Sequence, residues 1–303
     1  MDFLRVADLD PSGLTEVVEL ADGVKKDPAS VAGRLQGLRV GLFFEKPSNR
    51  TRVSTEVATT ELGGIPIVLR GEEVGLGRRE AVEDVARVLD RYLDVLAFRV
   101  FSHDDLTTLA DYSEAPVINL LSELEHPCQA LADLQTIGEH RPLPGTVVAY
   151  VGDGNNVCQS LMVAAAMTGM TVRVATPAGF EPDPAYRKRA AELAAASGGS
   201  VLITADADEA VTGADVVYTD VWASMGEEQE ADERRAKFAA YQIDEARFAR
   251  ADGGAIFLHC LPAHRDEEVA SAVIEHSRSR VFEQAENRLH TFKALLLYLN
   301  QGR

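Results

Sequence analysis

The positions of apolar residues along the chain predict an α/β protein. Short apolar runs alternate with longer segments of helical periodicity, and this alternation is typical of parallel sheets whose strands are joined by crossover helices. The expected strands cover residues 38–44, 95–98, 117–119, 147–151, 172–175, 200–204, 216–219 and 256–258. We therefore expect parallel sheets flanked by helices.

A Pro- and Gly-rich stretch at residues 140–145 predicts a domain junction. The length of 303 residues also suits about two domains. We predict a first domain over residues 1–140 and a second over residues 141–285. The apolar helix expected at 286–299 follows a polar stretch, so residues 286–303 are expected to pack back onto the first domain.

Composition narrows the class of function. A net charge of −18 leaves no excess of cations to displace the counterions of a nucleic acid, so nucleic-acid binding is not expected. The chain has no membrane-length apolar run and no signal-peptide pattern at its start, which predicts a cytoplasmic protein that binds no membrane. The 3 cysteines form no C-x-x-C pair, so we expect reduced thiols, no disulfide and no metal site.

Polar clusters follow most of the expected strands. In open parallel sheets, ligands bind beyond the carboxyl ends of the strands, where loops lead into helices. The clusters at such ends are residues 45–52, Arg99, residues 126–129, 152–156, 220–226 and 259–262. These clusters are therefore the candidate binding residues.

The segment 48–52, Ser-Asn-Arg-Thr-Arg, has the chemistry of a phosphate site. Hydroxyls, guanidiniums and the free N–H groups of a helix start all favour a phosphate, although an ordinary helix cap with solvated arginines is equally compatible. His126 and Pro127 open another helix, where the histidine is either a structural hydrogen-bonding group or a catalytic one.

Together these residues resemble the aspartate/ornithine carbamoyltransferase family. The family's motifs appear in order at residues 48–52, 99, 126–129, 220–226, 259–262 and 286–290, and the resemblance runs from residue 1 to about 298. The Ser-Met-Gly at 224–226 and the His-Cys-Leu-Pro at 259–262 resemble the branch that acts on ornithine. The resemblance implies transfer of the carbamoyl group of carbamoyl phosphate to the side-chain amine of L-ornithine, giving L-citrulline and phosphate, without a cofactor.

The resemblance also assigns roles to individual residues. Those implied to bind carbamoyl phosphate are Ser48, Asn49, Arg50, Thr51, Arg99, His126, Gln129, Cys260, Leu261 and Arg288. Among them, Arg99 and His126 would polarise the carbamoyl oxygen. Gln129 and the backbone of Cys260 and Leu261 would position the carbamoyl nitrogen.

The acceptor side is assigned in the same way. Those implied to bind ornithine are Asn156, Asp220, Ser224 and Met225. Cys260 and Asp220 would orient the attacking amine and help its proton leave, so the implied catalytic residues are Arg99, His126, Asp220 and Cys260. The family further implies a homotrimer, or a multiple of trimers, in arginine metabolism, for example in arginine biosynthesis.

Two positions depart from the family pattern, because Asn49 replaces a threonine and Gly75 a glutamine that reaches a neighbouring subunit's site. The glycine at position 75 is compatible with three hypotheses: the protein binds carbamoyl phosphate more weakly, another residue such as Arg78 compensates, or the protein is a specialised paralogue. A Gly75→Gln substitution is expected to tighten binding unless the glycine has a positive φ. The alternatives are thus a carbamoyltransferase for another diamine or diamino acid, and a catalytically dead binding relative.

The remaining candidate residues receive structural interpretations. The segment 152–156 lacks the G-x-G-x-x-G spacing of a dinucleotide-binding loop. Cys128 and Cys158 are expected to be packing residues within helices. The histidines at 103, 140, 264 and 276 lie in polar stretches and are expected to be solvated.

Overall fold

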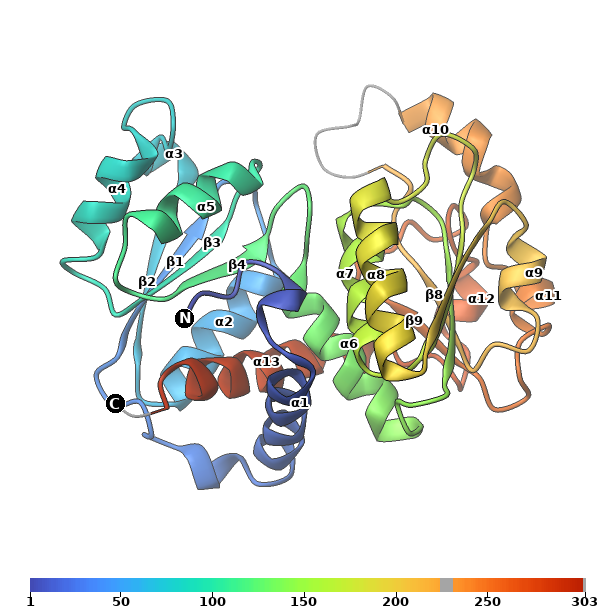
Figure 1. Cartoon of the computed structure of the whole chain (residues 1–303), viewed down its shortest axis with the longest axis horizontal. Coiled ribbons are helices and arrows are strands. Elements are labelled where there is room, and N and C mark those ends of the chain that lie inside the picture. The colour runs from blue at the N-terminus through green and yellow to red at the C-terminus, as the bar shows by residue number, and fades with distance from the viewer. Residues whose placement is uncertain (224–230, 302–303) are drawn as a thin grey trace. The chain divides into compact units, whose positions relative to one another are not determined.

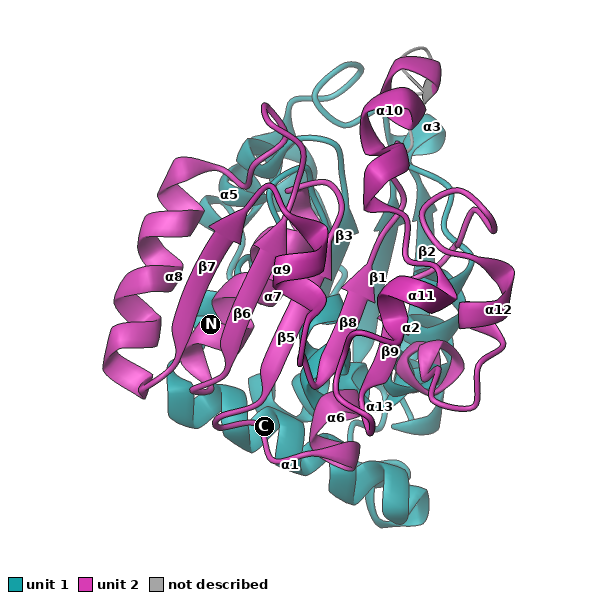
Figure 2. Ribbon diagram, turned by 90° about the vertical axis from the view of Figure 1, so that its right-hand side faces the viewer, with its two compact units in different colours: residues 1–135, 286–303 teal, residues 136–285 magenta. Residues whose placement is uncertain are grey.

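The computed structural model describes residues 1–223 and 231–301, and the chain forms two compact units (Figures 1 and 2). Unit 1 comprises Met1–Gln135 together with Glu286–Arg303, and unit 2 comprises Thr136–Ala285. The expected ornithine ligands Ser224 and Met225 lie outside the described residues.

Unit 1 is built on a 4-stranded parallel sheet of order β2-β1-β3-β4. Its strands are β1 (Arg39–Phe44), β2 (Ile65–Arg70), β3 (Val95–Arg99) and β4 (Val117–Leu121). Its helices are η1 (Val6–Asp8), α1 (Pro11–Lys26), η2 (Pro28–Val31), α2 (Arg50–Glu61), α3 (Gly71–Val74), α4 (Val82–Leu89) and α5 (His103–Asp111). Phe43 and Phe98 stack at 4.7 Å between ring centroids in the core of this unit.

Strand β2 is an addition to the predicted elements. Its sequence, IPIVLR, contains Pro66, which cannot donate a hydrogen bond to a neighbouring strand. The strand lies at the edge of the sheet and pairs with β1 alone, so the missing donor is tolerated there. Its residues are half-buried or exposed, unlike those of the central strands.

Unit 2 is built on a 5-stranded parallel sheet of order β7-β6-β5-β8-β9. Its strands are β5 (Val147–Val151), β6 (Thr171–Ala175), β7 (Ser200–Thr204), β8 (Val216–Thr219) and β9 (Ile256–His259). Its helices are α7 (Asn156–Met167), α8 (Pro184–Ser197), α9 (Ala207–Val211), α10 (Ala231–Phe238), η4 (Ala239–Tyr241), α11 (Glu245–Phe248) and α12 (Ser271–Ile274).

Two helices continue from one unit into the other, namely α6 (Pro127–His140) and α13 (Val281–Leu299). The part of α13 in unit 1 contacts α1, where the Lys25 ammonium donates to Asn287 Oδ1 at 2.8 Å. The predicted fold class, two parallel sheets flanked by helices with the C-terminal helix packed back on the first domain, is therefore confirmed. None of the helices in the described part of the chain is long and apolar enough to cross a membrane.

Each sheet has a point at which successive strands are added on opposite sides. In unit 1 this point lies between β1 and β3, and in unit 2 it lies between β5 and β8. Ligands of open parallel sheets bind at the carboxyl ends of the strands beside such a point. The fold thus provides one candidate binding region in each unit.

The expectation that His103 is solvated was wrong. This histidine is only 1% exposed, and its Nδ1 lies 2.8 Å from the Ser122 hydroxyl. Burial lowers its pKa, and the neighbouring Arg5 adds to this effect. His103 begins a helix whose first turn packs against the loop after β4, and this tertiary contact is not visible in the local polar sequence.

Candidate active site

The carboxyl ends of β1, β3 and β4 bring three of the expected segments together in unit 1. The register pairs Phe44 with Arg99, and Arg99 with Leu121, so the loops that follow these strands start side by side. The loop after β1 leads into α2, which begins at Arg50, and the loop after β4 leads through His126 into α6. Asn49 is the N-cap residue of α2, but its side chain accepts no hydrogen bond from the first N–H groups of this helix.

Arg288 of α13 joins two of these segments. Its guanidinium donates from Nη1 to Gln129 Oε1 at 2.6 Å and from Nη2 to the Thr51 hydroxyl at 3.0 Å. Arg288 and Gln129 are 5% and 1% exposed, and Gln129 in turn donates to Asp133 Oδ1 at 2.8 Å. This network fixes the start of α2 and the first turn of α6 against the C-terminal helix.

His126 is a buried histidine among three arginines. Its side chain is 5% exposed, and its Nε2 lies 3.5 Å from Nη1 of Arg288. Burial holds its pKa well below 6.5, and the charges of Arg288, Arg99 and Arg50 lower the pKa further. At neutral pH the imidazole is therefore neutral, and the arginines supply the positive charge of this region.

This shift predicts how stability depends on pH. The pKa of His126 is lower in the folded protein than the unfolded value near 6.5, so the unfolded chain takes up a proton first as the pH falls. The contribution of His126 to stability is complete at pH values above its unfolded-state pKa, and it is lost as the pH falls toward its folded-state pKa. We therefore expect the urea concentration at the midpoint of unfolding to fall as the pH is lowered from about 7.5 to about 5.5. His126→Gln should reduce this fall, and a pH slope equal to that of the wild-type protein would contradict the assignment.

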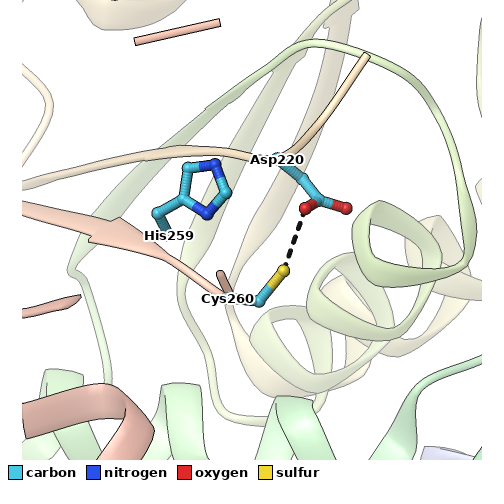
Figure 3. Close-up of side chains that lie close together, drawn as sticks. All are labelled: Asp220, His259 and Cys260. Carbon is cyan, nitrogen blue, oxygen red and sulfur yellow. Dashed lines mark hydrogen bonds between the residues drawn. The ribbon is translucent and has the colours of Figure 1, made fainter. Parts of the chain in front are cut away.

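In unit 2 the carboxyl ends of β8 and β9 place Asp220 beside Cys260. The register pairs Thr219 of β8 with His259 of β9. Asp220 directly follows β8 and Cys260 directly follows β9. The thiol Sγ of Cys260 donates to Asp220 Oδ1 at 2.9 Å, as Figure 3 shows. Asp220 is only 4% exposed, while Cys260 is half-buried. The pair thus offers a buried carboxylate with a thiol at its edge.

Asn155 was missed by the sequence interpretation, which selected its neighbour Asn156. The Asn155 side chain caps α7 by accepting from the N–H groups of Val157 and Cys158 at 3.0 and 3.1 Å. Its Nδ2 donates to Asp220 Oδ2 at 2.9 Å, so both oxygens of this carboxylate are engaged. The signal available in the sequence was the preference for asparagine at a helix N-cap.

His259, drawn in Figure 3, lies beside this pair but is held by other partners. Its Nδ1 accepts from the Leu261 N–H at 2.8 Å, and its Nε2 lies 3.2 Å from Glu268 Oε1. The ligand atoms of Asp220, His259 and Cys260 lie within 4.8 Å of one another, as in a metal site. Because both ring nitrogens of His259 already have partners in the protein, we assign no metal to this group.

The predicted site residues thus fall into two groups. Unit 1 holds Ser48, Asn49, Arg50, Thr51, Arg99, His126, Gln129 and Arg288, and unit 2 holds Asn156, Asp220, Cys260 and Leu261. Leu261 has φ of 59°, a left-handed backbone conformation that its bond to the His259 ring supports. The first group is cationic and the second contains a buried carboxylate.

Gly75 has a conformational reason to be glycine. It ends α3 with φ of 68° and ψ of 43°, the left-handed region in which a side chain is disfavoured. A Cβ at this position would lie 2.7 Å from Cβ of Arg79. The Arg78 side chain is 80% exposed and lies 3.9 Å from the Glu45 carboxylate.

Comparison with known proteins matches two family models to successive parts of the chain, and the second model includes residues 286–299 of α13, which belong to unit 1 in the structure. The model of the aspartate/ornithine carbamoyltransferase carbamoyl-P binding domain matches residues 1–139, and that of the Asp/Orn binding domain matches residues 144–299. The chain is 54% identical to ornithine carbamoyltransferase of Acidothermus cellulolyticus over 98% of this chain and 96% of that protein.

Solved structures agree. Ornithine carbamoyltransferase from Pyrococcus furiosus is 46% identical, with a TM-score of 0.97 over 100% of this chain and 97% of that chain. An N-acetyl-L-ornithine transcarbamylase is 30% identical, with a TM-score of 0.90 over 99% of both chains. The chain therefore belongs to the aspartate/ornithine carbamoyltransferase family.

Proposed function

We propose that this protein transfers the carbamoyl group of carbamoyl phosphate to the side-chain amine of L-ornithine, giving L-citrulline and phosphate. The observation that carries the proposal is the buried Asp220 carboxylate with the Cys260 thiol bonded to it, in a chain 54% identical to an ornithine carbamoyltransferase. A carboxylate of this kind suits the ammonium groups of a diamino acid. A neutral acceptor would gain nothing from it.

Carbamoyl phosphate is assigned to the cationic residues of unit 1. Ser48, Arg50 and Thr51 lie at the start of α2, where the N–H groups of the first turn and two-pronged arginine bonds favour a phosphate. The guanidinium of Arg288 donates from Nη1 to Gln129 and from Nη2 to Thr51. One of these N–H groups would turn toward the phosphate of the bound substrate. The phosphate of the substrate would thus be held by charge and by helix-end donors together.

Arg99 and His126 are assigned to the carbamoyl oxygen. As the amine attacks the carbonyl carbon, that oxygen gains negative charge, and fixed donors around it stabilise the transition state. The low pKa of His126 supports this role, because a neutral imidazole keeps an N–H to donate without itself requiring a counter-charge. The bond from the carbonyl carbon to the phosphate oxygen then breaks, and phosphate leaves with the bonding electrons.

Asp220 and Cys260 are assigned to the amine. The side-chain ammonium of ornithine, with a reference pKa of about 10.4, must lose a proton to give the neutral amine, whose lone pair can then attack. The Asp220 carboxylate is the group in this pair that can pair with the ammonium, and the Cys260 thiol is its hydrogen-bonded neighbour. Asn156 is assigned to the amino-acid end of ornithine, as are Ser224 and Met225.

For assembly and compartment, the proposal rests on the family resemblance. It places the protein in the cytoplasm as a homotrimer or a multiple of trimers, in arginine metabolism. In such an assembly the loop around Gly75 would approach a neighbouring subunit's phosphate site.

The proposal for this loop predicts the outcome of a substitution. Gly75→Gln should lower stability by about 1–2 kcal/mol, since a side chain there has a left-handed backbone and meets Arg79. Gly75→Ala carries the same strain without an amide and is therefore the matched control. If the loop reaches the phosphate, the glutamine variant should bind carbamoyl phosphate roughly tenfold more tightly than the alanine variant. Equal affinities by calorimetry would favour the reading of a specialised paralogue.

The acceptor is tested by initial rates with carbamoyl phosphate and a panel of amines. We expect L-ornithine to have the highest kcat/KM, because identity to ornithine enzymes exceeds that to the N-acetyl-L-ornithine enzyme. A higher kcat/KM for another diamine or diamino acid would establish the paralogue reading. Binding of carbamoyl phosphate without turnover of any amine would establish a catalytically dead relative.

A further inference from the structure

Arg234 of α10 is a buried cation to which the proposed function assigns no role. Its side chain is 8% exposed, and its guanidinium carbon lies 5.0 Å from the ring centre of Phe180 and 5.7 Å from that of Phe238. Burial of a charge among aromatic rings is costly unless specific partners compensate it. The position of this arginine is therefore determined by the groups to which it donates.

Those groups lie on two different loops. Nη2 of Arg234 donates to the carboxylate of Asp153, which follows β5 and is 9% exposed. Nε donates at 2.5 Å to the backbone oxygen of Trp222, two residues beyond Asp220 at the end of β8. One planar guanidinium thus joins the segment 152–155 to the segment 220–222.

The same two loops carry the acceptor residues. Asn155 of the first loop donates to Asp220 of the second at 2.9 Å, so Arg234 forms another connection between them. The first loop is also packed without spare room, since Gly154 donates to the Phe180 carbonyl at 2.9 Å. A Cβ on Gly154 would lie 2.3 Å from the Pro182 nitrogen.

We propose that Arg234 is a positioning residue for the amine acceptor. By holding Trp222 and Asp153 at once, it fixes where the Asp220 carboxylate and the Asn155 amide lie, although it does not itself touch the substrate. The inference rests on the proposed function, in which Asp220 binds the ammonium of ornithine. Lysine could keep the charge beside Asp153 but lacks the planar fork that donates in two fixed directions.

The test is Arg234→Lys, which leaves no buried carboxylate without a cation. We expect the KM for ornithine to rise roughly tenfold or more, while the Kd for carbamoyl phosphate stays within about twofold. Arg235→Lys is the matched control on the same helix. Arg235 is 48% exposed and pairs with Asp232 and Glu267, so its variant should keep both constants.

Asp153→Asn tests the other end of the connection. It should raise the KM for ornithine as Arg234→Lys does, and the double variant should be little worse than either single one, since both changes break the same contact. An unchanged KM in folded Arg234→Lys protein, or equal losses for both substrates, would overturn the proposal. Thermal melting and carbamoyl-phosphate titration identify a variant that fails to fold.

If only Arg234→Lys fails to fold, the KM of Asp153→Asn decides. If both fail, Arg234 serves folding alone and the proposal is wrong. A wild-type protein that makes no citrulline would overturn the proposed function instead, and this outcome is distinct from an active variant with an unaltered KM.

Discussion

Arg50→Ala is expected to weaken carbamoyl-phosphate binding by roughly a hundredfold or more, since two charge-assisted hydrogen bonds at about 1.5–3 kcal/mol each are lost. Arg50 is the first residue of α2 and is half-buried beside His126, whose pKa it lowers. The fold should survive, because the residue lies at a helix start and not in the hydrophobic core. Calorimetry with carbamoyl phosphate measures the effect.

Arg52→Ala is the matched control for this experiment. Arg52 lies on the same helix two residues on, is 45% exposed and pairs with Glu56 at 2.7 Å. Its removal should leave carbamoyl-phosphate affinity unchanged. Equal losses in both variants would show a general charge effect, and unchanged binding in Arg50→Ala would remove Arg50 from the phosphate site.

Asp220→Asn is expected to lower kcat/KM for ornithine by roughly a hundredfold or more, with carbamoyl-phosphate affinity within about twofold. An amide has no charge to pair with an ammonium, and its NH2 group would oppose the Cys260 thiol or the Asn155 amide, which now donate to the two carboxylate oxygens. Steady-state rates at varied ornithine, with separate carbamoyl-phosphate titrations, measure the two effects.

The control for Asp220 is the carboxylate at the opposite end of the same strand. Asp215 precedes β8, accepts from Arg141 at 2.7 Å and lies away from the carboxyl end of the sheet. Asp215→Asn should lower stability and leave the kinetic constants of the folded protein alone. A loss of affinity for both substrates in Asp220→Asn would contradict the separate roles of the two units.

The sequence predicted most of the fold because periodicity and strand-end chemistry are local. The runs that became β5, β7 and β8 agree with the structure at both ends, since each is a compact apolar segment bounded by turn residues. Strand β2 was not predicted, because Pro66 and half-exposed side chains give an edge strand the appearance of a loop. Helix α13 begins at Val281, before the predicted start at 286, and its first turn belongs to unit 2.

The sequence predicted those residues of the candidate site that belong to motifs at the ends of strands. Asp220 and Cys260 were expected to act together, and the strand register explains their contact. Asn155 and Arg234 were missed because their roles depend on partners 65 and 81 residues away in the sequence. The neutral state of His126 likewise results from burial and from arginines on other elements, which no local pattern records.

The most direct test of the central claim follows the carbamoyl group itself. Carbamoyl phosphate labelled at its carbonyl carbon is incubated with L-ornithine and the purified protein, and the products are identified by nuclear magnetic resonance. The account predicts that the label appears in the ureido carbon of L-citrulline, with equimolar release of phosphate and no formation without the protein. Phosphate release without labelled citrulline, or label that enters only another amine in the panel, would contradict it.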